Sequence, residues 1–85
     1  MPYRIEFAPR ADRDLGGLPG DVQRRVKVRV EALAEDPRPR GVEKLSGEEG
    51  LYRIRIGTYR VIYEIRDRVL VVLILKLGHR REVYR

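Results

Sequence analysis

The sequence contains no cysteine and only one histidine in 85 residues. A disulfide framework is therefore excluded, and a metal site would have to be built almost entirely from carboxylates. The longest apolar run, residues 69–75, is far too short to span a bilayer, and no apolar segment follows a charged start as in a secretory signal. These absences favour a cytoplasmic protein with no bound metal, no small-molecule cofactor and no membrane partner.

A chain of this length is expected to form one domain, residues 1–85, with a single hydrophobic core and no large cavity. The formal net charge is +6, and its excess lies in residues 44–85, which carry ten basic and five acidic side chains. Sixteen of the nineteen basic residues are arginine, whose planar fork suits contact with phosphate and stacking on bases. A biased genome or a hot habitat would also enrich arginine, so position must decide.

Hydrophobic spacing predicts a strand, two helices and then three strands. The fold class is α+β in the order β-α-α-β-β-β: a small, mainly antiparallel sheet with two N-terminal helices on one face. The last strand is apolar on both faces, so it should lie inside the sheet, and the N-terminal strand should pair with its free edge. The expected elements are strand 3–7, a helix from Pro9 to Gly16, a helix over 21–35 with Asp21 as its N-cap, and strands 51–56, 59–66 and 69–77.

Gly57-Thr58 matches a two-residue type II′ turn, and such a turn fixes the register of the hairpin that contains it. Arg55 then lies opposite Arg60. One face of the hairpin is apolar and packs on the helices; it consists of Tyr52, Ile54, Ile56, Tyr59, Val61 and Tyr63. Arg53, Arg55 and Arg60 gather on the other face, which is the candidate site.

Like charges placed directly opposite each other destabilise a sheet, so the Arg55–Arg60 pair needs a reason. One reason is anion binding; the alternative is that both guanidinium groups point into water or pair with Glu64 and other carboxylates.

The tail "GHRREVYR" adds His79, Arg80, Arg81 and Tyr84. Their side chains suit proton transfer, base stacking and charge stabilisation in metal-free phosphodiester cleavage. The alternative is a solvated histidine and a tyrosine that closes the edge of the core.

Four segments occur together in a specific order: "YRIEFAPRADRDLGGLP", "DPRPRGVEKLSG", "LYRIRIGTYRVIYEI" and "GHRREVYR". This ordered set resembles the RelE/ParE toxin superfamily over nearly the whole chain. The resemblance implies the toxin of a type II toxin–antitoxin system. In the RelE branch such toxins are ribosome-dependent endoribonucleases that cut mRNA in the A site, whereas the ParE branch inhibits DNA gyrase.

The RelE-like reading implies roles for individual residues. It assigns catalysis to Arg55, Arg60, Arg80, Tyr84 and His79, and RNA binding to Arg53, Lys44 and Arg81. The best-known RelE member has lysines where Arg53 and Arg55 stand, and a guanidinium, which is always protonated, cannot act as a general base. Attack by the RNA 2′-hydroxyl would therefore be activated by Tyr84 or by neutral His79, with arginines carrying the charge.

The partners implied are a cognate antitoxin and the ribosome with its mRNA. An acidic, disordered antitoxin segment is expected to cover the arginine face, and Val28, which lies off the core stripe of its helix, offers a second docking route. A gyrase inhibitor without catalysis and a catalytically degenerate RNA-binding module remain as alternatives.

Overall fold

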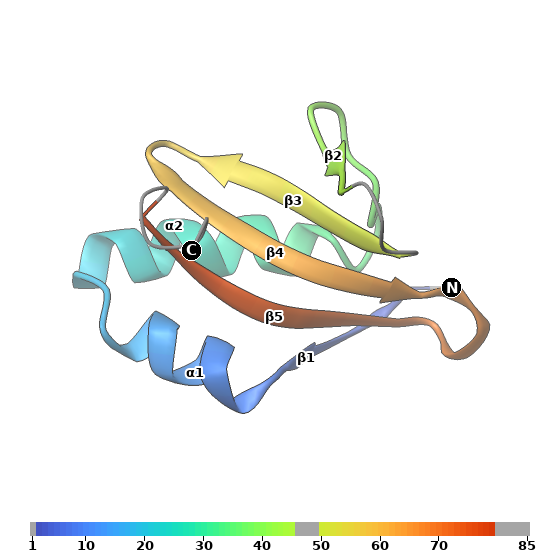
Figure 1. Cartoon of the computed structure of the whole chain (residues 1–85), viewed down its shortest axis with the longest axis horizontal. Coiled ribbons are helices and arrows are strands. Elements are labelled where there is room, and N and C mark those ends of the chain that lie inside the picture. The colour runs from blue at the N-terminus through green and yellow to red at the C-terminus, as the bar shows by residue number, and fades with distance from the viewer. Residues whose placement is uncertain (1, 46–49, 80–85) are drawn as a thin grey trace.

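A computed structural model describes residues 2–45 and 50–79, in which a five-stranded mixed sheet packs against two helices (Figure 1). The sheet order is β1-β5-β4-β3-β2; β1 pairs with β5 in parallel and the other neighbours are antiparallel. The elements are β1 (Arg4–Phe7), α1 (Pro9–Gly16), α2 (Gly20–Ala32), β2 (Glu43–Lys44), β3 (Leu51–Ile56), β4 (Tyr59–Arg66), the 3-10 helix η1 (Asp67–Val69) and β5 (Val71–His79). The predicted fold class is confirmed; β2 and η1 were not predicted from the sequence.

The core lies between the helices and one face of the sheet. Helix α1 contributes Ala11 and Leu15, and α2 contributes a stripe that includes Val26 and Val30. Val28 lies off this stripe, as predicted, and is 65% exposed. The predicted N-cap is wrong: α2 begins one residue earlier, and Asp21 lies in its first turn. Within the described residues, no helix is long and apolar enough to cross a membrane.

The central hairpin has the predicted register. Ile56 pairs with Tyr59 and Arg55 with Arg60. Gly57 has a φ of 62° whereas Thr58 does not have a positive φ, which is the pattern of a type II′ turn. Glycine is favoured here for its backbone angle; a Cβ at this position would lie 2.8 Å from Arg25 Nη2, the end of a flexible side chain that would have to move.

Strand β5 begins two residues later than predicted. Asp67–Val69 form the 3-10 helix η1, and Leu70 adopts a left-handed conformation with φ 55° before the strand starts. The strand lies inside the sheet between β1 and β4, as expected. Its two faces are buried to different degrees: Ile74 is fully buried on the helix side, whereas Leu73, on the opposite face, is half-buried.

The far end of β5 extends beyond β1, and helix α1 supplies the missing hydrogen bond there. The Leu77 amide donates to the Asp14 carboxylate at 3.1 Å. A side chain therefore satisfies a backbone group that an edge strand would leave open. This contact fixes the segment that carries Gly78 and His79.

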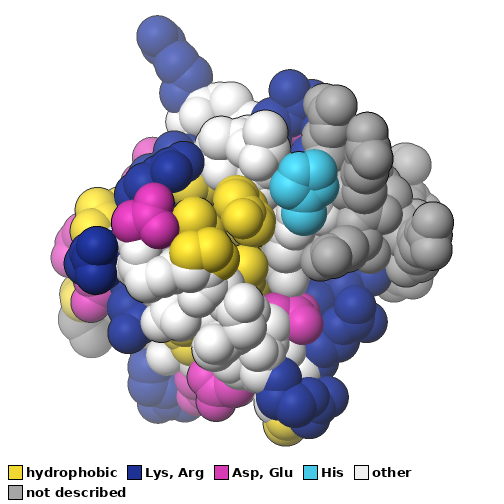
Figure 2. Space-filling view, turned by 90° about the vertical axis from the view of Figure 1, so that its left-hand side faces the viewer, with side chains coloured by type: hydrophobic (Ala, Val, Ile, Leu, Met, Phe, Trp, Pro, Cys, Tyr) yellow, Lys and Arg dark blue, Asp and Glu magenta, His cyan; other side chains and the backbone are white. Residues whose placement is uncertain are grey.

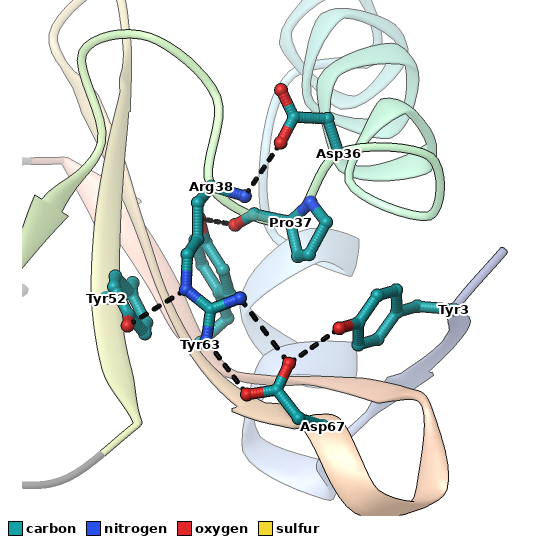
Figure 3. A network of polar contacts seen from close by, with 7 residues as sticks. All are labelled: Tyr3, Asp36, Pro37, Arg38, Tyr52, Tyr63 and Asp67. Carbon is teal, nitrogen blue, oxygen red and sulfur yellow. Dashed lines mark hydrogen bonds and ion pairs between the residues drawn. The ribbon is translucent and has the colours of Figure 1, made fainter. Parts of the chain in front are cut away.

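The loop after α2 is held by two tyrosines (Figure 3). The Tyr63 side chain is fully buried, and its hydroxyl donates to the Pro37 carbonyl at 2.8 Å. Tyr52 stacks on Tyr63 with ring centroids 6.0 Å apart, and its hydroxyl accepts a hydrogen bond from Arg38 Nε at 3.1 Å. Burial raises the pKa of the Tyr63 hydroxyl well above its usual range, which keeps it protonated as a donor.

Asp67 links this loop to Tyr3, the residue that precedes β1 at the opposite edge of the sheet. Its carboxylate accepts the Arg38 guanidinium at 2.9 Å and the Tyr3 hydroxyl at 2.6 Å. The hydrogen bonds from Arg38 and then from Tyr3 hold the pKa of Asp67 below its usual range. The loop, η1 and the start of β1 are thus fastened together.

We expect Tyr63→Phe to destabilise the protein by about 1–3 kcal/mol, because the buried Pro37 carbonyl loses its donor while the core keeps its shape. In a domain of this size that corresponds to a fall in Tm of roughly 4–8 °C per kcal/mol. Thermal denaturation measures it. Tyr59→Phe, at the half-buried end of the same strand, is the control, and an equal loss in both variants would contradict the assignment.

Asp67→Asn should lower Tm at neutral pH, and its deficit relative to wild type should shrink on acidification. Because the folded-state pKa of Asp67 is depressed, its stabilisation is fully present above the ordinary aspartate pKa of about 4 and is lost as pH falls through the lower folded value. Melts of both proteins between about pH 7 and pH 2.5 check this. A deficit that stays constant across the range would show that the carboxylate charge contributes nothing.

Candidate functional site

Strands β3 and β4 place Arg53, Arg55 and Arg60 on the sheet face opposite the helices. Alternation sends Ile54 and Val61 into the core, so the arginines between them point the other way. We call these three residues the arginine cluster.

The members of the cluster differ in exposure. The Arg55 side chain is 62% exposed, whereas that of Arg53 is 11% exposed and residue Arg60 is only 8% exposed. Arg60 is therefore buried in this face of the sheet, as is Ile62, two residues further along β4. Arg55 is the member that an incoming ligand can reach most easily.

A carboxylate that the sequence analysis did not select lies against the cluster. Glu43 Oε2 is 2.8 Å from Arg53 Nη2, and Glu43 Oε1 is 3.7 Å from Arg55 Nε. The hydrogen bond from Arg53, with smaller contributions from the charges of Arg55 and Arg60, lowers the pKa of Glu43. The sequence left open a pairing with Glu64 and other carboxylates; Glu43 is such a carboxylate, whereas Glu64 pairs with Arg66 at 3.0 Å.

Strand β2 explains how Glu43 reaches the cluster. This strand has only two residues, and its register places Glu43 opposite Arg53. A two-residue strand has no readable alternation, and the register across the connection to β3 cannot be derived from the sequence. No sequence signal therefore marked Glu43.

Lys44 lies apart from the arginine cluster. It pairs with Tyr52, whose side chain belongs to the core face, so Lys44 and Glu43 point to opposite faces of the sheet. Lys44 lines a pocket of about 350 Å³ together with Arg38 and Asp67. The structure therefore does not bring Lys44 together with Arg53 in one RNA-binding surface.

His79 is also separated from the cluster by the sheet. It pairs with Tyr59, and the two rings meet edge to face with centroids 5.8 Å apart. Arg60 pairs with Gly78 instead, on the opposite face. Figure 2 shows the histidine at the surface, next to hydrophobic side chains. The predicted tail residues Arg80, Arg81 and Tyr84 lie outside the described residues.

Helix α2 carries a second basic surface. Arg24, Arg25 and Arg29 surround Val28 along an open groove of about 450 Å³, which is closed on its other side by Ile56 and Gly57. This groove lies on the helix side of the molecule and the arginine cluster on the other. The protein thus presents two chemically different basic surfaces.

The arginine cluster has the chemistry of a phosphate site. Guanidinium groups bind phosphate through two parallel hydrogen bonds. The opposed Arg55 and Arg60 can stabilise the negative charge that develops on a phosphate during cleavage. Within residues 2–45 and 50–79, no three histidine, aspartate or glutamate side chains converge as metal ligands.

Comparison with known proteins agrees with these features. The family model described as "ParE toxin of type II toxin-antitoxin system, parDE" matches residues 5–84. Toxin RelG of Mycobacterium tuberculosis is 35% identical over 86 residues, which cover 100% of this chain and 99% of the relative. The mRNA interferase toxin RelE of Escherichia coli K12 is 31% identical over 88 residues, covering 99% and 92%.

Solved structures show the same architecture. In the archaeal RelE–RelB complex from Pyrococcus horikoshii, one chain matches with a TM-score of 0.83 and 38% identity, over 94% of this chain and 97% of that one. The sequence match and the shared fold together confirm the resemblance inferred from the four segments. This chain therefore belongs to the ParE toxin family of type II toxin–antitoxin systems, within the RelE/ParE superfamily.

Proposed function

We propose that this protein is a toxin that arrests translation by cutting messenger RNA in the ribosomal A site. The observation that carries the proposal is the arginine cluster, in which Arg55 and Arg60 are held directly opposite each other. A sheet tolerates such a pair at a cost, and a phosphate between or beside the two groups removes that cost. The name of the E. coli relative, an mRNA interferase, supports RNA as the source of the phosphate.

In this mechanism the RNA 2′-hydroxyl gives its proton to Tyr84 or to water and attacks the adjacent phosphorus; the bond to the 5′-oxygen breaks, and this oxygen takes up a proton and leaves as a hydroxyl. Arg55 and Arg60 stabilise the charge that develops on the phosphate oxygens, and Arg53 holds the backbone. From the tail, Arg80 assists the leaving oxygen, Tyr84 contributes to proton transfer, and Arg81 binds RNA.

No described residue of this site is well suited to accept the proton of the RNA 2′-hydroxyl. The guanidinium groups cannot accept a proton. Glu43 is a carboxylate whose pKa is lowered by Arg53, far from the near-neutral value that suits a general base. His79 points to the other face of the sheet. An enzyme with so little basic catalysis depends on its substrate being held in line, and the ribosome provides that orientation.

Gyrase inhibition is the second candidate, because the matching family model carries the ParE name. A protein that inhibits gyrase by binding alone needs no phosphate-binding arginine pair. The effect of replacing Arg55 on activity therefore distinguishes the two functions.

A cognate antitoxin is the second partner that we propose. Relatives of similar fold have been solved with RelB antitoxins, from P. horikoshii and from M. tuberculosis. An acidic segment is suited to both basic surfaces: the arginine cluster attracts carboxylates, and the exposed Val28 among the α2 arginines adds an apolar contact.

Arg55→Ala should reduce mRNA cleavage in a purified ribosome assay by about 10²–10³-fold, as removal of one donor to a developing oxyanion does. Arg55→Lys should retain part of the activity, since it keeps the charge and loses the fork. Primer extension on the mRNA measures the cuts. Arg68→Ala, an exposed arginine on η1, is the matched control and should cleave like wild type.

Two results would contradict the proposal. If wild type makes no codon-positioned cuts but inhibits gyrase, the second candidate function is correct. If cleavage requires a metal bound stoichiometrically to the toxin, the arginine mechanism fails; toxin treated with chelator and desalted before mixing should cleave normally.

Antitoxin binding should weaken in Arg55→Ala, and the remaining affinity should depend less on salt. The lost part is a screened charge interaction, whereas apolar contacts such as those of Val28 remain. Titration calorimetry at several KCl concentrations measures both effects. An affinity and a salt dependence equal to those of wild type would exclude the arginine cluster from the antitoxin interface.

A further inference from the structure

Glu43 lies against two members of the arginine cluster, Arg53 and Arg55. Its two carboxylate oxygens divide their contacts: Oε2 lies 2.8 Å from Arg53 and Oε1 lies 3.7 Å from Arg55. The first distance is that of a charge-assisted hydrogen bond, and the second is too long for one. Glu43 is therefore bound firmly to one arginine and loosely to the other.

The pairing with Arg53 has a structural reason. The Arg53 side chain is 11% exposed, and a guanidinium so far removed from water needs a counter-ion. Glu43 is 44% exposed and comes from a short strand at the edge of the sheet. Its carboxylate can therefore turn without disturbing the core.

Arg55 does not need a counter-ion in this way, because its side chain is 62% exposed and well hydrated. Glu43 Oε1 faces Arg55 Nε, which belongs to the edge of the guanidinium that binds a phosphate with two hydrogen bonds. A phosphate oxygen bound to this Nε would lie beside Glu43, and two negative groups so close repel each other.

We propose that Glu43 is an internal competitor for the RNA phosphate site: it keeps its bond to Arg53 and gives up Arg55 when a phosphodiester binds. This inference rests on the proposed role of the arginine cluster in binding RNA. This competition makes the site selective among RNA molecules. The carboxylate weakens binding to RNA in general, so that only RNA presented with additional contacts, as on the ribosome, displaces it.

The test measures the binding of a short, fluorescein-labelled single-stranded RNA to the full chain by fluorescence anisotropy. Glu43→Gln removes the charge and keeps an oxygen that can accept the Arg53 hydrogen bond. We expect it to bind RNA about fivefold more tightly at about 0.1 M salt, from the loss of one like charge next to the phosphate. Because Arg55 is then fully available, the slope of log K against log salt should steepen by roughly 0.7.

Glu6→Gln is the matched control. Glu6 is 43% exposed and pairs with Arg4 at 2.7 Å, but it lies on β1, at the opposite edge of the sheet from β2. It makes the same change in net charge and should leave the affinity within about twofold of wild type, because exposed charges farther apart than the Debye length are screened. A thermal melt verifies that each variant is folded.

Arg55→Ala provides the second arm. If Glu43 competes through Arg55, the gain from Glu43→Gln should disappear when Arg55 is already alanine. The inference is overturned if Glu43→Gln binds no more tightly than Glu6→Gln, or if its gain persists without Arg55. If Arg55→Ala alone binds RNA as tightly as wild type, the phosphate site itself is wrong and the proposed function falls with it.

Discussion

The two-residue turn at Gly57-Thr58 sets the register of the central hairpin, and the two faces of the sheet depend on that register. Gly57 can adopt its φ of 62° without strain, whereas a residue with a side chain would be strained at this angle. A slip of one residue would exchange the faces, sending arginines toward the helices and isoleucines toward solvent. The apolar core thus holds the arginines in place.

The fold places Arg55 and Arg60 opposite each other although they repel, and the connection between α2 and β2 brings a carboxylate to the cluster. Tyr63 and Arg38 fix the start of that connection, and β2 at its end delivers Glu43 to Arg53. Among the described residues, the carboxylate of Glu43 lies against Arg53 and Arg55 of the cluster. The same residues therefore stabilise the cluster and keep it attractive to polyanions.

Sequence patterns predicted the parts of the fold that depend on local periodicity. The helix stripe, the exposed Val28 and the hairpin pairs all follow from spacings of three or four residues, or of two. Glu43 was missed because its partner is set by a connection whose register no local rule fixes.

The position of His79 could not be predicted for a related reason. The pairing of β4 with β5 shifts register between Ile62 and Tyr63, and η1 delays the start of β5. The register shift changes which side chains of β5 beyond it face the helices, whereas the later start, by two residues, keeps the alternation. The burial of Arg60 depends on the packing of the whole face, which a list of alternating residues does not contain.

The central claim is that the arginine cluster, and not the basic surface of α2, binds RNA phosphate. Its most direct test is an NMR titration of the arginine side-chain Nε–H signals with a short single-stranded RNA. The account predicts that the signal of Arg55 shifts first and most, accompanied by those of Arg53 and Arg60, while those of Arg24, Arg25 and Arg29 change little. Shifts confined to the three α2 arginines would contradict it.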